Sequence, residues 1–170
     1  NKMSFKKTFV LLGVVLLSLW GMESYGSENQ DHGRKTLTEA TKKSVISVLE
    51  VNEKLHNSFF KYDGKSVEEN ALELKKAINS IENKEIAKLL NFSQVKLSEI
   101  KAANDRETNN KNYHLVSMAL IHILNKYDVG ANYNAYSCPM VKKKWLQNKN
   151  KMSKVHNPYA SNMPHCGRQD

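Results

Sequence analysis

The chain has 170 residues, a formal net charge of +9 and 40% hydrophobic residues. This length suits one ordinary domain with its own core, and the lack of internal repeats or low-complexity tracts excludes a repeat array. A basic cytoplasmic protein of this kind would suggest a nucleic-acid partner. The N-terminal segment, however, predicts export.

Residues 1–27 have the pattern of a secretory signal peptide. Lys6 and Lys7 form its positive end, an apolar run follows, and small residues near Gly26 offer a cleavage site. The continuous apolar stretch 9–17 is shorter than the ~20 residues of a membrane span, so an uncleaved anchor is the less favoured alternative. Cleavage would lower the net charge by two, to +7. We therefore predict a periplasmic or secreted protein with no stable membrane span after cleavage.

The rest of the chain is predicted to be helical. Residues 28–36 are polar and are interpreted as a flexible leader, and residues 37–170 as a single domain. Apolar residues at three- and four-residue spacing predict four amphipathic helices. Their apolar stripes run through 45–59, 67–81, 86–100 and 116–127. Short connections and few glycines then favour an all-α fold, an up-down four-helix bundle.

Local signals mark the helix ends. Asp63-Gly64 is expected to end the first helix, and the segment from Ser66 to Glu69 has the form of a capping box for the second. Asn83 is a candidate N-cap of the third helix. Residues 104–111 form either a loop or the first turns of the fourth. The segment that follows, residues 131–167, lacks the alternating runs of strands and is expected to form an irregular C-terminal hook.

Sulfur is concentrated in this hook. Both cysteines, all three prolines and three of the six methionines lie between Cys138 and Cys166. Thiolate, thioether and imidazole groups suit Cu(I) better than hard cations. The candidate ligands are the thiolates of Cys138 and Cys166 and the thioethers of Met140 and Met163, with His165 or His156 completing the shell. Zinc and covalent haem are disfavoured because their characteristic Cys and His spacings are absent.

The motifs of the hook resemble those of a bacterial family of exported domains of unknown function, which also occurs at the C-terminus of some heavy-metal efflux adaptor proteins. The resemblance rests on Tyr136-Ser-Cys-Pro-Met140, Trp145-Leu146, Asn157-Pro-Tyr159, Met163 and Cys166-Gly167, and on Tyr113-His-Leu-Val-Ser117 in the preceding helix. It covers about residues 37–167. It implies a helical bundle, copper handling in the bacterial cell envelope, and an efflux or copper-handling protein as partner.

The chain departs from the family pattern at two places. Ala160 and Ser161 follow Tyr159 where the family usually has a glycine, which affects the expected turn geometry. Asn110 stands where the family tends to have an arginine, which removes an expected ion pair. The second departure has no bearing on metal binding.

A disulfide is the main alternative for the two cysteines. Two cysteines alone in an exported domain most often form one. A Cys138–Cys166 bond would close a loop of about 29 residues, stabilise the fold by ~3.5 kcal/mol and remove both thiolates from metal chemistry. Two idle thiols are a third alternative. Met140 and Met163 beside the cysteines favour metal slightly, although methionine also fills gaps in cores.

A second candidate metal site lies on the predicted fourth helix. His114, Met118 and His122 are spaced i, i+4, i+8, so they share one helix face. The alternative is that Met118 packs against a neighbouring element while the histidines lie at the surface. Such spacing often arises by chance, which favours the alternative.

Lysines surround Trp145 in the hook. They are Lys142, Lys143, Lys144, Lys149, Lys151 and Lys154. In an exported protein such a patch could bind anionic lipid head groups or an acidic partner, but a solvated loop with Trp145 packed beneath it is the more common arrangement.

We expect no enzymatic activity and no nucleic-acid partner. Catalytic motifs are absent from the sequence, and a Cys nucleophile with His156 or His165 would lack an orienting partner. The sequence therefore predicts an exported envelope protein that binds a soft metal ion, Cu(I), as a chaperone, buffer or efflux accessory. The alternative is a disulfide-stapled helical interaction module that binds no metal.

Overall fold

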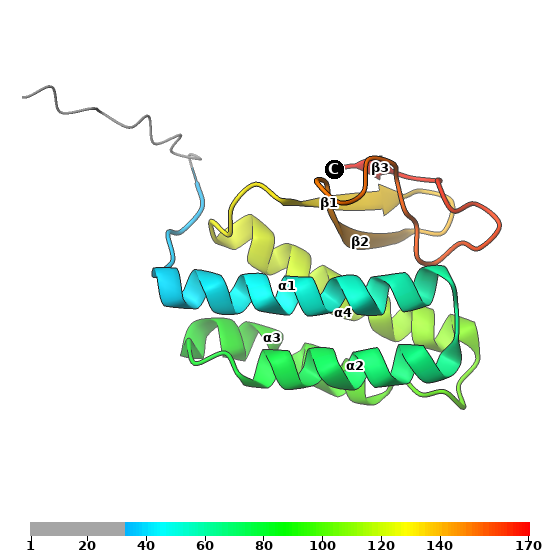
Figure 1. The fold of residues 1–170 in the computed structure, drawn as a ribbon, viewed down its shortest axis with the longest axis horizontal. Coiled ribbons are helices and arrows are strands. Elements are labelled where there is room, and N and C mark those ends of the chain that lie inside the picture. The colour runs from blue at the N-terminus through cyan, green and yellow to red at the C-terminus, as the bar shows by residue number, and fades with distance from the viewer. Residues whose placement is uncertain (1–32) are drawn as a thin grey trace, which may run out of the picture. The chain divides into compact units, whose positions relative to one another are not determined.

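The computed structural model describes residues 33–170, and these form four helices followed by three short strands (Figure 1). The helices are α1 (Glu39–Phe60), α2 (Gly64–Asn79), α3 (Lys84–Ser98) and α4 (Arg106–Lys126), and the strands are β1 (Tyr133–Cys138), β2 (Lys143–Asn148) and β3 (Arg168–Gln169). The predicted signal peptide, 1–27, lies outside the described residues. In the described part, no helix combines the length and hydropathy needed to cross a membrane.

The four helices pack in sequence, α1 on α2, α2 on α3 and α3 on α4, which confirms the helical part of the prediction. The expected apolar stripes are buried, because each helix turns its three- and four-residue repeat toward the others. Asn52, the polar interruption of the first stripe, is buried on α1 and accepts a hydrogen bond from the Tyr113 hydroxyl of α4 at 3.2 Å. Burial of this amide is therefore compensated.

Each helix begins at a side-chain cap. Asn83 caps α3 as predicted, accepting from the Ile86 amide at 3.1 Å. The capping box expected at Ser66 is wrong, because α2 begins earlier, at Gly64, and Asp63 accepts from the Ser66 amide at 3.1 Å. An aspartate three residues before that amide provides the stronger, charged acceptor. Most of the ambiguous segment 104–111 belongs to the first turns of α4.

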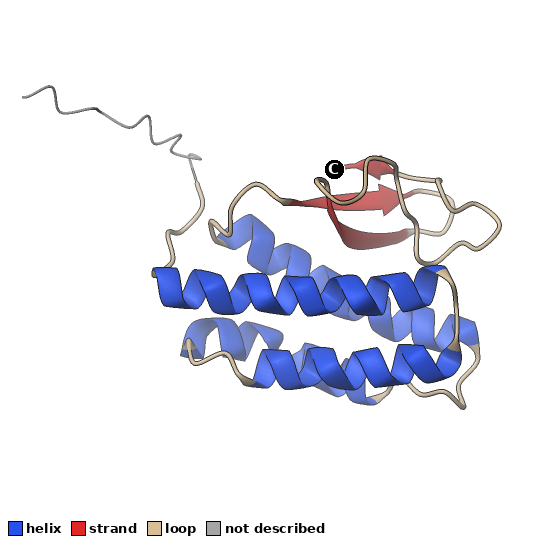
Figure 2. Cartoon of the chain, in the orientation of Figure 1, coloured by secondary structure: helices blue, strands red, loops and turns tan. Residues whose placement is uncertain are grey.

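A small antiparallel sheet follows the helices, so the fold is mostly helical and the all-α prediction is wrong. The strand order is β2-β1-β3, and β1 pairs with both neighbours (Figure 2). In Figure 1 the sheet lies along the side of the bundle formed by α1 and α4. The hook is therefore not irregular throughout. Tyr136 and Trp145 are directly opposite across β1 and β2, with stacked rings 6.0 Å apart, an arrangement that stabilises strand pairing.

The strands escaped prediction because β2 is covered on both faces. Its last four residues, 145–148, are all buried, so no polar and apolar alternation marks it. Asn148 donates to the Glu53 carboxylate of α1 at 3.0 Å. On the opposite face, Gln147 donates to the carbonyl of Lys154 at 2.6 Å. The helices therefore cover one side of β2 and the following loop covers the other.

Tyr159 attaches the hook to both α4 and β2. Its buried hydroxyl lies 3.1 Å from Ser117 Oγ on α4 and donates to the Lys144 carbonyl of β2 at 3.0 Å. Its ring packs near Tyr113 and Trp145, with centroid distances of 5.7 and 6.2 Å. One side chain thus joins three elements that are far apart in the sequence.

Lys35, in the predicted leader, is hydrogen-bonded to the chain at the end of α4. The Lys35 amide donates to the carbonyl of Lys126, and the Lys35 carbonyl accepts from the Asp128 amide, both at 2.9 Å. Residues next to α1 therefore pair with the chain as it leaves α4.

We predict that Tyr159→Phe lowers the free energy of unfolding by about 1–3 kcal/mol, because the buried Lys144 carbonyl and Ser117 hydroxyl lose their common partner. Urea unfolding followed by circular dichroism measures this change. Tyr136→Phe is the matched control, since within residues 33–170 the Tyr136 hydroxyl has no hydrogen-bond partner. Equal midpoints for the two variants would contradict the assigned role of Tyr159.

Candidate metal site

The structure brings the two cysteines together. Cys138 is the last residue of β1, and Cys166 lies two residues before β3, so pairing of Ser137 with Arg168 places them side by side. Both are free, and their thiols lie close enough for each to shift the pKa of the other. Cys138 is only 1% exposed, whereas Cys166 is partly exposed. The pair therefore has one inner and one outer sulfur.

The turn after β1 favours a thiolate at Cys138. Burial raises the pKa of this thiol, but hydrogen bonds from Cys166, from the backbone N–H groups of Val141 and Met140, and from the Asn157 side chain outweigh burial and lower the pKa below its usual value. The hydrogen bond to Cys138, together with burial, raises the pKa of Cys166. Of the two thiols, Cys138 is thus the one that loses its proton first as the pH rises.

Asn157 and Gly167 fix the position of Cys166. The Asn157 side-chain amide donates to the Cys166 carbonyl at 2.9 Å, and its backbone N–H donates to the Pro164 carbonyl at 2.8 Å. Gly167 has φ +142°, and a Cβ there would lie 2.6 Å from Cη2 of Trp145. A side chain at 167 would therefore push β3 away from Trp145 and separate the two thiols.

The two candidate methionines lie on either side of the thiol pair. Met140 is in the turn whose N–H groups contact Cys138, and its side chain is 68% exposed. Met163 is partly buried, and its carbonyl accepts from the Cys166 amide at 3.0 Å. Met163 therefore shares a tight turn with Cys166, whereas the Met140 thioether extends into solvent.

The two candidate histidines have different surroundings. His165 is exposed, and its Nδ1 lies 2.7 Å from the Val155 carbonyl. Because a carbonyl can only accept, Nδ1 carries the proton and Nε2 keeps a free lone pair. His156 is instead half-buried in a ring stack, with centroids 3.4 Å from Phe60 and 5.1 Å from His56. His165 is the more accessible of the two for a metal.

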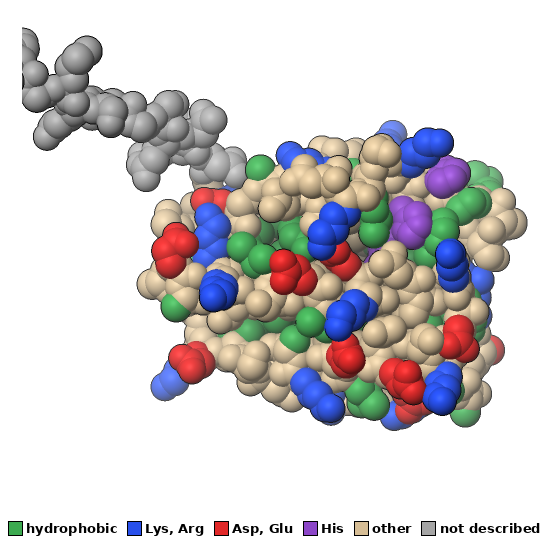
Figure 3. All heavy atoms as spheres, in the orientation of Figure 1, with side chains coloured by type: hydrophobic (Ala, Val, Ile, Leu, Met, Phe, Trp, Pro, Cys, Tyr) green, Lys and Arg blue, Asp and Glu red, His purple; other side chains and the backbone are tan. Residues whose placement is uncertain are grey.

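His56 was missed by the sequence analysis. It is buried on α1, and its Nε2 lies 2.8 Å from Nδ1 of His156. His56 Nδ1 has no hydrogen-bond partner, so the less costly tautomer has Nε2–H donating to His156. Burial and the nearby His156 lower the pKa of His56 to about 3. The sequence feature that could have revealed His56 is its position, as a histidine, within the buried stripe of α1. Figure 3 shows histidines with apolar neighbours at the surface of this region.

The structure does not bring the three residues of the second candidate metal site, on α4, into one pocket. His114 Nδ1 accepts the Lys144 backbone N–H at 3.2 Å, and it is half-buried. Met118 is 41% exposed, and His122 is exposed. His114 and Met118 line a common pocket to which His122 does not contribute. This second site stays a prediction.

The lysine patch around Trp145 is partly neutralised by ion pairs. Three lysines of the predicted patch pair with acids: Lys143 with Glu107, Lys144 with Asp170 and Lys151 with Glu53. Trp145 is fully buried beneath them.

Within residues 33–170, no cluster of three or more His, Cys, Asp or Glu side chains is arranged to hold a metal ion. A metal at the thiol pair would therefore depend on sulfur ligands.

Comparison with known proteins adds no identification. No family model, no curated protein and no solved structure matches this chain. The resemblance to exported domains of unknown function stays a prediction.

The His56–His156 contact predicts a pH-dependent stability. His56 has a folded pKa of about 3 and an ordinary value of 6.5, so the unfolded chain binds its proton first. The stabilisation is present above pH 6.5 and is lost as the pH falls toward 3, by up to about 1.4 kcal/mol per pH unit. Urea unfolding at pH 7, 6 and 5 measures this slope. We expect His56→Phe to flatten it.

The matched control is His122→Gln, which removes an exposed histidine from α4. It should keep the wild-type slope. A slope that is unchanged in the His56→Phe variant would show that other groups cause the pH dependence.

Proposed function

We propose that this is an exported envelope protein that binds Cu(I) through Cys138 and Cys166, as a chaperone, buffer or efflux accessory. The observation that carries the proposal is the pairing of β1 with β3, which places the two cysteines side by side, close enough for each thiol to shift the pKa of the other. Cu(I) binds well to two or three soft ligands, and hydrogen bonds to a thiolate stabilise its anionic form. Within residues 33–170 no three His, Cys, Asp or Glu side chains are arranged to hold a metal, and zinc sites usually have four such ligands.

The two sulfurs have different roles in this proposal. Cys138 is the buried thiolate that retains the metal, and Cys166 is the accessible ligand through which the ion enters or leaves. Binding displaces the proton that Cys166 holds, so copper uptake is coupled to proton release. Met163, in the same turn as Cys166, is the favoured third ligand. Met140 and His165, at the surface, are positioned to act during transfer.

A disulfide-stapled interaction module remains the second candidate. The same thiol contact favours it, because two cysteines must lie side by side to be oxidised. A Cys138–Cys166 bond would connect β1 to the segment before β3 and close the loop that contains β2. Such a protein would dock on an envelope partner and bind no copper.

We expect reduced protein to bind one Cu(I) with sub-micromolar affinity when titrated against a competing cuprous chelator. Cys138→Ser/Cys166→Ser should weaken binding by about 100-fold or more, because both thiolates are lost. Met163→Leu should weaken it by a smaller factor of about three to ten. Met152→Leu, in the same hook but outside the candidate set, is the matched control. Affinity no better than micromolar, and unchanged in the double serine variant, would refute the copper proposal.

A thiol count on protein purified without reductant separates the two candidates. We expect two titratable thiols per chain and, after copper addition, one bound ion with both thiols protected. Zero thiols, no copper uptake after reduction, and a loss of about 3.5 kcal/mol of stability on reduction would instead support the stapled module.

A further inference from the structure

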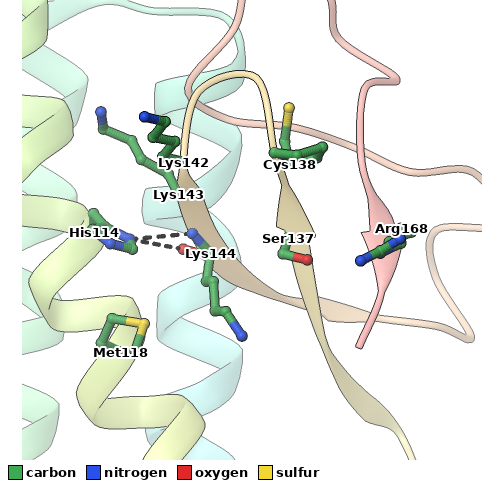
Figure 4. Close-up of a pocket in the computed structure, with 9 residues that line it drawn as sticks. His114, Met118, Ser137, Cys138, Lys142, Lys143, Lys144 and Arg168 are labelled. Carbon is green, nitrogen blue, oxygen red and sulfur yellow. Dashed lines mark hydrogen bonds between the residues drawn. The ribbon is translucent and has the colours of Figure 1, made fainter.

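A pocket of about 310 Å³ lies between α4 and the hairpin formed by β1 and β2 (Figure 4). His114 and Met118 line it from α4, the lysines 142–144 from the start of β2, and Arg168 from β3. Cys138 also contributes to its wall, but Figure 4 shows the Cys138 sulfur pointing away from Lys144 and Arg168. The pocket is thus separate from the thiol contact, although the two features share β1.

The charged side chains that line this pocket are all positive. Its lining contains four cationic side chains and no carboxylate. Two nearby acids partly compensate: Glu107 pairs with Lys143 at 3.2 Å, and Asp170 pairs with Lys144 at 2.8 Å and also acts on Arg168. Two acids against four cations leave an excess of two positive charges. Such an excess attracts anions and opposes binding of a second metal cation by His114 and Met118.

One of these residues, Lys142, has an unfavourable backbone conformation. Lys142 has φ +52° and is the one non-glycine residue with a positive φ among residues 33–170. Most side chains avoid this conformation, and outliers of this kind cluster at binding sites. Here it reverses the chain after β1 and leads into Lys143 and Lys144 of β2.

The pocket also has an apolar part and an imidazole. Met118 is 41% exposed there. His114 Nδ1 lies 3.2 Å from the Lys144 amide nitrogen and 3.4 Å from the Lys144 carbonyl oxygen. Apolar surface, a few polar groups and a volume near 300 Å³ are typical of small-molecule sites.

We propose that this pocket binds a small organic anion with a carboxylate head and a short apolar tail. The head contacts Lys144 and Arg168, Lys142 adds to the positive charge of the lining, and the tail packs on Met118 toward α4. The inference is independent of copper, because neither thiol is a ligand in it.

Octanoate is the probe, titrated into the full-length protein by isothermal calorimetry at low salt. We expect saturable binding that weakens with added salt. Lys142→Gln/Arg168→Gln should weaken it by about five- to tenfold, since one charge contact and one further positive charge of the lining are lost. The matched control, Lys149→Gln/Lys154→Gln, makes the same charge change at exposed positions outside the pocket and should bind as wild type does. Met118→Gln should weaken octanoate more than it weakens acetate.

Several results would overturn the proposal. These are the absence of saturation at millimolar octanoate, equal affinity for 1-octanol, and equal weakening in the pocket and control variants. Co-sedimentation with phosphatidylglycerol vesicles, lost in the pocket variant and without binding of free octanoate, would assign the charges to a lipid surface instead. The substituted lysines and arginine are solvent-exposed, so we expect thermal midpoints near that of wild type. These midpoints test whether each variant folds.

Discussion

The arrangement of the C-terminal half depends on the buried hydroxyl of Tyr159. It joins Ser117 of α4 to the Lys144 carbonyl at the free edge of β2, where unpaired backbone groups would otherwise remain in a dry environment. His114 satisfies the adjacent Lys144 amide. Two residues before Tyr159, Asn157 binds the Cys166 carbonyl. The segment that fixes the sheet to the helices therefore also holds the backbone of Cys166.

The sequence predicted the helices well because their signal is local. Each stripe repeats every three or four residues, and Asn83 caps the helix that follows it. The sheet was not predictable in the same way. β2 is buried on both faces by elements distant in sequence, α1 through Glu53 and the loop through Lys154, so its pattern of polar residues carries no period of two. The segment was expected to be irregular, and its hairpin was not predicted.

The candidate site was predicted in part for a similar reason. Residue chemistry alone selected Cys138 and Cys166, and the pairing of β1 with β3 brings them into contact. His56 was missed because its partner, His156, is 100 residues away, and a single histidine in an apolar stripe usually indicates packing. Conversely, Asn157 and Tyr159 stood out as motif residues, and their contacts give both a structural role: Asn157 holds the Cys166 carbonyl, and Tyr159 attaches the hook to β2.

The asymmetry of the thiol pair determines what the site can do. The inner sulfur is stabilised as an anion by turn amides but is shielded from solvent, and the outer sulfur is accessible but holds the proton. A cuprous ion or an oxidising disulfide therefore meets Cys166 first. Both reactions need the thiolate form, because the thiolate is the metal ligand as well as the nucleophile in disulfide exchange. The geometry of the pair therefore suits metal binding and oxidation alike.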